Sequence, residues 1–350
     1  MPKRTSTQSN SGSEMRGGRS EADSPLQRQI IAGPRLKQIT FIRSWAWQPS
    51  RNAPPQDCMS APSPSFLSTI HTPEEILAHP RFATARGAFV DAVLGLHDGD
   101  VFSSRLLVEA MRQITFNMIV SLHLRHDERD RATWPTPRRL KYEMRMFGLA
   151  SDRRIDALVS RLVQLGYVES RISEEDGRVR LLSPTDKMMS LDREWLYYHH
   201  LPLHLLFPDS YAEPVARDPL FQRAQRLVAL EFTTKGADIM ARNPAVMRFM
   251  GRDSGILVLI KLVQMQMSAG DGKQGLSYSD IGVRFGISRT HVRGLLEDAA
   301  QHGDVSLSGR GGRLVELQPS MLRAFDRFLA DAMSGHDLLY KLTLERMAKA

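Results

Sequence analysis

Arginine side chains gather in two stretches of this sequence, residues 153–161 and 289–293, and both stretches carry apolar residues at helical spacing. A guanidinium group can donate two hydrogen bonds to guanine, and it can also neutralise a phosphate. Another basic run, residues 138–145, precedes the first stretch. These residue types favour contact with a nucleic acid.

Motifs for catalysis are absent from the sequence, which contains no glycine-rich phosphate loop, no Gly-x-Ser-x-Gly elbow and no zinc-protease pattern. The three histidines of "YYHHLPLH" (197–204) have no cysteine or carboxylate cluster at metal-ligand spacing, which favours a role in packing or at an interface. We therefore expect no enzymatic activity, no metal and no cofactor.

The 350 residues are 42% hydrophobic and 25% charged, which is typical of a globular protein with two or three domains. Cys58 is the only cysteine, so neither an internal disulfide nor a cysteine zinc cluster can form. No apolar run approaches the roughly 18 residues of a membrane span, and the N-terminus has no signal-peptide core. We expect a cytoplasmic protein without membrane contact.

Residues 1–65 are rich in Ser, Pro, Gly and Arg, a composition that predicts a disordered basic tail. They contain nine Lys and Arg against four Asp and Glu, so only +3 of the net charge of +8 belongs to the rest of the chain. A DNA surface there must come from local placement of charge. Trp45 and Trp47 could form a docking peptide; the alternatives are a chance apolar patch in a tail, or an untranslated region with Met59 as the true start.

An internal repeat organises the remaining residues. Four segments of the first half align with segments of the second half at offsets of 134 to 139 residues; "RRIDALVSRLVQLGYV" (153–168), for example, aligns with "THVRGLLEDAAQHGDV" (290–305). A nearly constant offset indicates a duplicated unit. We predict two domains, 66–205 and 206–350, each with flanking long helices. The apolar spacing predicts helices over 73–96 and 103–124.

The second copy has the pattern of a helix-turn-helix. Gly286 suits a tight turn with positive φ, Ser288 suits the N-cap of a following helix, and Gly303 suits its C-terminal end. Two helices joined by so short a turn must cross steeply. The small residue Gly282 and the aliphatic Val292 stand at the spacings that this motif requires.

The first copy repeats the scheme with differences. Gly148 is the turn glycine, Ser151 caps the next helix, and the turn is one residue longer. Met144 occupies the position of the small residue, so we expect looser packing or a different crossing of the two helices there.

Each helix pair is followed by a predicted β-hairpin. Strands are expected at 167–172 and 178–183, and the second copy repeats them around the turn "SGRGGR" (308–313). A helix-turn-helix followed by a hairpin is a winged helix, whose second helix enters the DNA major groove while the hairpin reaches the minor groove or the phosphates. The predicted fold class is mainly α with small β-wings (α+β), built as two tandem winged helix-turn-helix domains with flanking long helices.

Three segments resemble the MarR-type winged-helix regulators of bacteria: "SDRRIDALVSRLVQLGYVESR" (151–171), "EEDGRVRLLSPTDKM" (174–188) and "ISRTHVRGLLEDAAQHGDV" (287–305). The resemblance covers about 65 residues per copy. It implies a wing in which Asp176 precedes an Arg, Arg178, that enters the minor groove. Family members are usually single-domain chains of about half this length that dimerise, and the second wing lacks the Asp.

The candidate DNA-contacting residues lie on the helix pairs and wings of both copies. They are Arg138, Arg139, Lys141, Arg153, Arg154, Ser160, Arg161 and Arg178 in the first copy, and Ser288, Arg289, Thr290, His291, Arg293, Arg310 and Arg313 in the second.

Together these features predict a nucleoid-associated, sequence-specific regulator of transcription that binds double-stranded operator DNA as a monomeric pseudo-dimer or a homodimer. Unlike outward residues on the two copies predict two unlike half-sites about 10 base pairs apart. No residue identifies a small-molecule effector. A plasmid-type replication initiator and a winged-helix scaffold that binds proteins instead of DNA are the alternatives.

Overall fold

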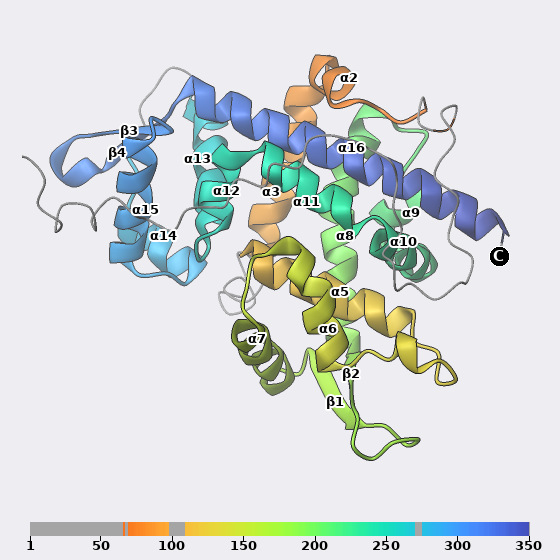
Figure 1. The fold of residues 1–350 in the computed structure, drawn as a ribbon. Coiled ribbons are helices and arrows are strands. Elements are labelled where there is room, and N and C mark those ends of the chain that lie inside the picture. Colours follow the sequence, from red (N-terminus) through yellow and green to blue (C-terminus); the bar gives the residue numbers. More distant parts are fainter. Residues whose placement is uncertain (1–65, 67–68, 98–108, 270–274, 350) are drawn as a thin grey trace, which may run out of the picture. The chain divides into compact units, whose positions relative to one another are not determined.

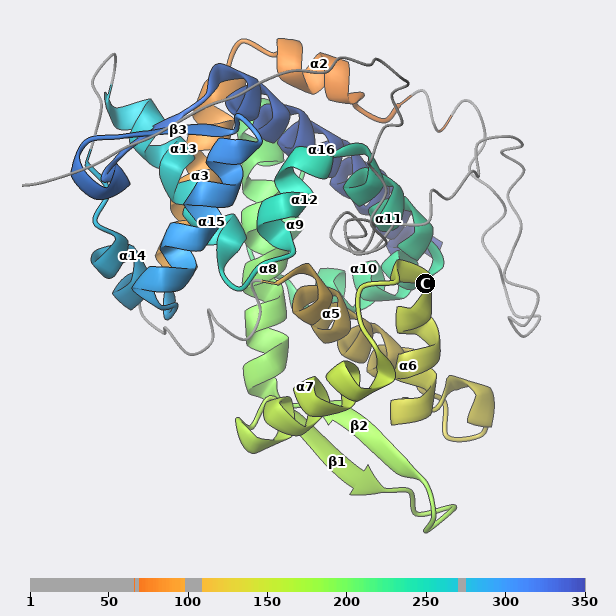
Figure 2. The ribbon, with the colours of Figure 1, turned by 60° about the vertical axis from the view of Figure 1, so that its left-hand side comes forward.

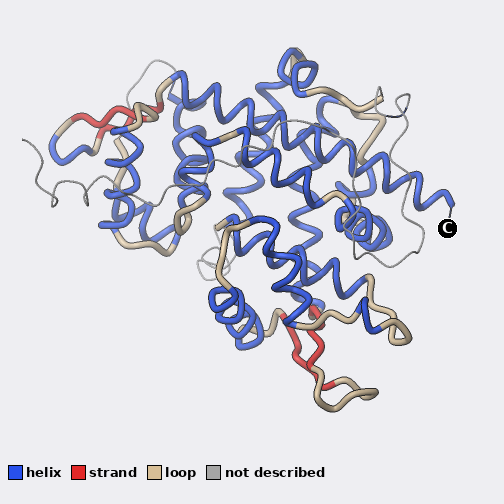
Figure 3. The backbone as a smooth tube through the Cα atoms, in the orientation of Figure 1, coloured by secondary structure: helices blue, strands red, loops and turns tan. Residues whose placement is uncertain are grey.

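The described part of the chain is mainly helical and contains two small antiparallel sheets of two strands each (Figure 1, Figure 3). The computed structural model describes residue 66 and residues 69–97, 109–269 and 275–349. The predicted tail at 1–65, with Trp45, Trp47, Cys58 and Met59, lies outside these residues. No described helix is long and apolar enough to cross a membrane.

Within the described residues, the α-helices before the first helix–hairpin unit are α2 (Pro73–Ala78), α3 (Phe82–His97) and α5 (Ala110–Leu124). The Thr72 hydroxyl accepts a hydrogen bond from the Glu75 amide while the Glu75 carboxylate accepts one from the Thr72 amide, so a capping box starts α2. Helix α5 is buried on most of its faces, as expected from its nearly continuous apolar sequence. It corresponds to the predicted helix at 103–124, of which 103–108 lie outside the described residues.

The first helix–hairpin unit, residues 137–184, follows. It consists of α6 (Pro137–Met144), the 3-10 helix η2 (Arg145–Phe147), α7 (Asp152–Gln164), β1 (Val168–Ile172) and β2 (Arg180–Pro184). The strands pair from Val168 with Pro184 to Ile172 with Arg180. Beyond α7, this hairpin extends away from the helices (Figure 2).

The second helix–hairpin unit, residues 278–317, has the same order of elements. It contains α14 (Tyr278–Phe285), α15 (Arg289–Gln301), β3 (Val305–Ser308), η3 (Arg310–Gly312) and β4 (Leu314–Leu317). The strands pair from Val305 with Leu317 to Ser308 with Leu314. Both hairpins therefore lie where the sequence pattern predicts them.

Helices of varied length surround the two units. They are α8 (Asp186–Leu206), α9 (Ala212–Val215), α10 (Pro219–Glu231), α11 (Thr233–Arg242), α12 (Pro244–Met250), α13 (Gly255–Ala269) and α16 (Pro319–Lys349), together with the 3-10 turn η1 (Arg131–Thr133). In both units a long helix, α8 or α16, begins two residues after the second strand.

Two large hydrophobic cores hold most of the described helices together, and Val228, Leu338 and Leu342 form a third, small cluster between α10 and α16. The smaller core belongs to α5 and the first unit and includes Phe116, Leu140, Ile155 and Leu162. The larger core joins α3 and the C-terminal half of α8 to α13, the second unit and α16. Helices on both sides of the predicted boundary at 205/206 thus share one core, and the described residues all belong to a single compact unit.

Candidate nucleic-acid interface

The turn between α14 and α15 is closely packed around two glycines. Gly286 has φ 67° and ends α14, and the Ser288 hydroxyl accepts a hydrogen bond of 3.0 Å from the His291 amide to start α15. A Cβ atom placed on Gly282 would lie only 2.6 Å from the Ile287 carbonyl oxygen. The two helices can approach this closely because residue 282 has no side chain.

The corresponding turn of the first unit is longer and less tightly capped. The 3-10 helix η2 intervenes before Gly148, which has φ 61°, and the Ser151 side chain makes no capping hydrogen bond at the start of α7. Met144 is buried and its sulfur accepts a hydrogen bond of 3.8 Å from the Thr115 hydroxyl of α5. A methionine in place of the small residue therefore packs against α5, and the two helices are connected differently from α14 and α15.

The turns of the two hairpins also differ. In the first, the Asp176 carboxylate accepts a hydrogen bond from the Arg178 amide (3.2 Å) and forms an ion pair with Arg131 (3.4 Å). In the second, the turn contains Gly309, Gly311 and Gly312, all with positive φ. The Asp176 and Arg178 pair suggested by the family resemblance thus forms a local turn that leaves the Arg178 side chain exposed.

Several of the predicted DNA-contacting residues are exposed and form no side-chain hydrogen bond or ion pair within the described part of the chain. Arg153 and Arg289 lie in the first turn of α7 and α15 respectively. The predicted residues that are both exposed and without such a partner are Arg138, Arg153, Ser160, Arg178, Arg289, Thr290, Arg310 and Arg313. Both helix pairs therefore present an exposed arginine in the first turn of the second helix, at its second position in α7 and at its first position in α15.

Other predicted residues form ion pairs or hydrogen bonds with groups of the same chain. Lys141 forms an ion pair with Asp156 of α7 at 3.0 Å, and Arg139 forms one with Glu143 at 2.6 Å. In α7, Arg161 donates to Gln164 at 3.2 Å. In α15, Arg293 forms an ion pair with Glu297 at 3.4 Å, and Ser288 serves as the N-cap. These side chains support the helix pairs themselves.

Two further predicted residues contact groups far away in the sequence. Arg154 of α7 forms an ion pair with Glu109 at 2.7 Å, and Nε2 of His291 in α15 lies 3.1 Å from the Asp253 carbonyl oxygen. Arg112 forms ion pairs with both acids, at 3.1 Å to Glu109 and 2.8 Å to Asp253. The sequence analysis did not identify Glu109, Arg112 or Asp253, because nothing in their local spacing relates them to the helix pairs.

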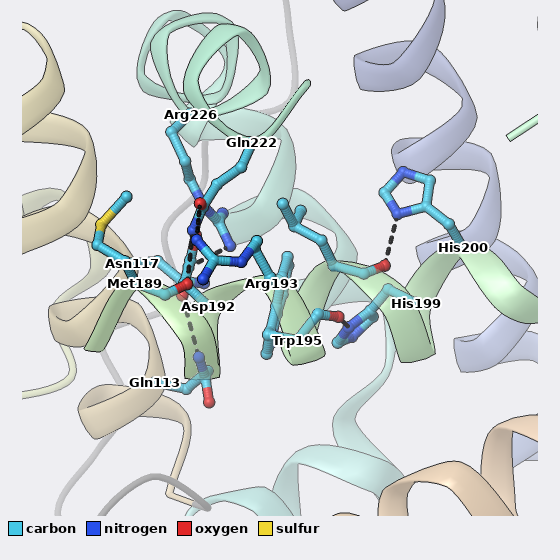
Figure 4. A network of polar contacts seen from close by, with 11 residues as sticks. Gln113, Asn117, Met189, Asp192, Arg193, Trp195, His199, His200, Gln222 and Arg226 are labelled. Atoms are coloured by element: carbon cyan, nitrogen blue, oxygen red, sulfur yellow. Dashed lines mark hydrogen bonds and ion pairs between the residues drawn. The ribbon is translucent and has the colours of Figure 1, made fainter. Parts of the chain in front are cut away.

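The histidines of the sequence motif at 197–204 lie on α8 among aromatic rings. His200 is buried, Nδ1 of its ring contacts the Leu196 carbonyl oxygen at 2.7 Å (Figure 4), and burial lowers its pKa to about 4. The pKa of His336 on α16, whose ring centroid is 5.2 Å from that of His200, is also lowered well below the ordinary value by burial. Neutral, buried rings of this kind pack the helices. The described residues contain no cluster of His, Cys, Asp or Glu able to hold a metal ion.

Comparison with protein-family models, with characterised proteins and with solved structures gives no match for this chain.

Proposed function

We propose that the two helix–hairpin units are winged helices of the MarR type and that they bind double-stranded DNA selectively, with α7 and α15 as the DNA-reading helices. The chain would then act as a regulator of transcription that combines in one molecule what a dimer supplies elsewhere. The arrangement that supports this most strongly is repeated twice: a glycine with positive φ, an exposed arginine in the first turn of the next helix, and an antiparallel hairpin. In winged helices that helix enters the major groove.

The free cations are distributed as such a function requires. Arg153 and Arg289 lie at the N-terminal ends of the DNA-reading helices, which are the ends that contact base edges in helix-turn-helix proteins. Arg310 and Arg313 lie on or beside the glycine-rich wing of the second unit, where the absence of side chains permits a close approach to a phosphate backbone. Each arginine that reads a base should contribute about 1 to 3 kcal/mol of discrimination.

A protein-binding scaffold is the second candidate, favoured by apolar exposure on the first helix of each pair. The side chain of Val283 in α14 is 75% exposed, and those of Tyr142 in α6 and Met146 in η2 are about half exposed. Exposed apolar side chains of this size can mark a surface that binds another protein. A replication initiator would use the same DNA-binding geometry, but its sites would be direct repeats at an origin instead of a promoter.

The test is fluorescence anisotropy of the full chain on genomic fragments, including its own promoter, at several salt concentrations. The Arg153→Ala/Arg289→Ala double variant should lose about 100-fold in affinity for its best fragment, since each contact contributes about one power of ten or more. Arg223→Ala is the matched control, because Arg223 is exposed on α10, outside both units.

Selective binding that weakens with salt and is lost only in the double variant would support DNA-reading by α7 and α15. If every fragment binds no better than random DNA, and the double variant behaves as the parent does, the proposal is wrong and the protein-binding scaffold becomes the better explanation.

A further inference from the structure

We propose that an ion-pair bridge formed by Glu109, Arg112 and Asp253 fixes the separation of α7 and α15, and thereby the spacing between the two DNA half-sites that the chain accepts. The first part of this proposal, that the bridge fixes the separation of the two helices, is the mechanical part and concerns the protein alone. The second part, about half-site spacing, rests on the proposed function.

The bridge is a continuous series of contacts from one helix to the other. Arg154 of α7 contacts Glu109 at 2.7 Å, and the other carboxylate oxygen of Glu109 lies 3.1 Å from Arg112. Nη2 of Arg112 contacts Asp253 at 2.8 Å, and the Asp253 carbonyl oxygen lies 3.1 Å from Nε2 of His291 in α15. Polar contacts therefore link two helices that are separated by more than a hundred residues along the chain.

Each end of the bridge is fastened to a different helix–hairpin unit. Glu109 is the N-cap residue of α5, and Arg112 lies in the first turn of that helix, which packs against α6 and β2 of the first unit. Asp253 lies in the turn between α12 and α13. The neighbouring Ser254 donates to the Phe285 carbonyl oxygen at the end of α14 (3.1 Å). The bridge thus joins α5, which packs on the first unit, to the Asp253 turn, which is hydrogen-bonded to the second unit.

Further ion pairs hold the Asp253 turn to the second unit. Arg252 contacts Asp298 of α15 at 2.9 Å, and Arg248 donates to the Asp304 carboxylate from Nε at 3.1 Å and from Nη2 at 2.7 Å. Because these contacts lie within the second half of the chain, they position the turn but do not cross to the first unit. Within the bridge, the ion pair that crosses from α5 to the turn between α12 and α13 is the one between Arg112 and Asp253.

The two ends of the bridge differ in burial. The Glu109 side chain is 9% exposed and lies between two arginines, whereas the Asp253 side chain is 54% exposed. A buried carboxylate with two cationic partners is held firmly, because removing either partner leaves charge in a poorly solvated site. An exposed ion pair is weaker and is screened by salt. Asp253 is therefore the residue whose removal should release the bridge without unfolding either unit.

Arg154 and His291 consequently act as positioning residues. Both were candidates for direct DNA contact, yet their polar groups are directed to the bridge. The residues that remain available for bases at the start of the two helices are Arg153 and Arg289, whose relative position the bridge would set. A rigid separation makes binding depend on the spacing between half-sites, as it does for dimeric helix-turn-helix proteins.

The distance between α7 and α15 tests the mechanical part directly. Nitroxide labels on Gln164→Cys and Gln301→Cys, in a full chain with Cys58→Ser, report this distance by double electron–electron resonance. We expect one narrow distribution in the parent, and a broader or shifted one in both Asp253→Ala and Arg112→Met. The matched control is Asp298→Ala, which removes an ion pair of the same turn that does not cross between the units. Unchanged distributions in both bridge variants would overturn the proposal.

The second arm uses the duplex that the parent chain selects from a random-sequence library, with one or two base pairs inserted or removed between its half-sites. The parent should lose about tenfold or more in affinity on the altered duplexes, whereas Asp253→Ala should lose less than about threefold and keep its affinity for the original duplex. Equal losses in the parent and in Asp253→Ala would refute the role in spacing. If the parent selects no duplex at all, the proposed function fails, and the distance measurement still decides whether the bridge sets the separation.

Discussion

The Arg226→Met substitution should lower the free energy of unfolding by about 4 kcal/mol, because it leaves a buried carboxylate without its cation. The Arg226 side chain is 3% exposed and that of Asp192 is 0% exposed. Arg226 donates to both oxygens of Asp192, at 3.0 and 2.7 Å, across the contact between α10 and α8 (Figure 4). At a site this buried, an unpaired charge raises the free energy of the folded state strongly, whereas a paired charge raises it much less.

The expected magnitude follows from what the variant leaves behind. Removing one partner of a buried ion pair typically costs about 3 to 5 kcal/mol, and the Arg226 guanidinium also lies over the Trp195 ring at 4.6 Å, a contact that contributes further when desolvated. Gln222 still donates to Asp192 at 2.8 Å in the variant, which keeps the cost from rising above that range.

A double substitution separates the cost of an orphaned charge from the worth of the pair. Asp192→Leu/Arg226→Met removes both charges, and Gln222 retains its hydrogen bond of 2.9 Å to the Met189 carbonyl oxygen. We therefore expect the double variant to be more stable than Arg226→Met by about 2 kcal/mol or more. The control is Arg217→Met, which breaks the exposed ion pair with Glu194 and should cost about 1 kcal/mol or less.

Urea denaturation followed by circular dichroism and by tryptophan fluorescence provides the measurement, with the slope of the transition checked for two-state behaviour. The reasoning is refuted if Arg226→Met costs no more than Arg217→Met, or if the double variant is less stable than Arg226→Met alone. Either result would mean that water or structural relaxation solvates Asp192 in the folded state.

Three further predictions use the same denaturation assay. Ser288→Ala should cost about 1 kcal/mol because it removes a capping hydrogen bond, whereas Ser151→Ala should cost much less because that side chain makes none; equal costs would contradict the capping geometry. Gly282→Ala should cost about 1 to 3 kcal/mol because its Cβ would clash with a carbonyl oxygen, while Gly294→Ala, with open space around it, should stabilise α15 by about 0.5 to 1 kcal/mol. Stability should also fall as the pH drops from 7 to 5, since burial lowers the pKa of His200 to about 4 and the unfolded chain takes up a proton below about 6.5 that the folded chain excludes. The slope is about 1.4 kcal/mol per pH unit for each such histidine. His200→Gln is measured in parallel, and the prediction is wrong if the stability of the parent does not change over this range.

Local sequence chemistry predicted the helix pairs and hairpins accurately. Ser288 begins α15 and Gly286 has the left-handed conformation expected of a turn glycine. Strands expected at 167–172 and 178–183 are found at Val168–Ile172 and Arg180–Pro184. These features depend on residues close together in the chain, such as caps, positive-φ glycines and period-two apolar alternation, and that is the information a single sequence contains most directly.

Partners distant in the chain could not be predicted. Glu109 lies 45 residues from Arg154, and Asp192 lies 34 residues from Arg226. Arg226 belongs to a helix with charged and polar residues at many positions, so nothing in its sequence context separates a buried arginine from an exposed one. For the same reason, the sequence analysis did not predict the intramolecular ion pairs of Arg154, Lys141 and Arg293, although the side chains of Arg154 and Arg293 are about half exposed, as expected of outward-facing residues.

The internal ion pairs also limit how far the proposed DNA-binding surfaces of the two units can differ. Arg154 and Arg161 are engaged on α7 and Arg293 is engaged on α15, so each helix retains one unpaired arginine among its described contacts, Arg153 or Arg289. The helices themselves are therefore more alike than their sequences suggest.

The wings and turns retain the asymmetry. The first wing carries Glu174, Glu175 and Asp176 beside Arg178, whereas the second places Arg310 and Arg313 around three glycines. Acidic groups oppose the approach of a phosphate, and a glycine-rich basic turn permits it. If both units bind one duplex, the second wing should therefore contribute more of the salt-dependent affinity than the first, and the difference between half-sites should lie in the flanking phosphates and minor groove more than in the bases that Arg153 and Arg289 contact.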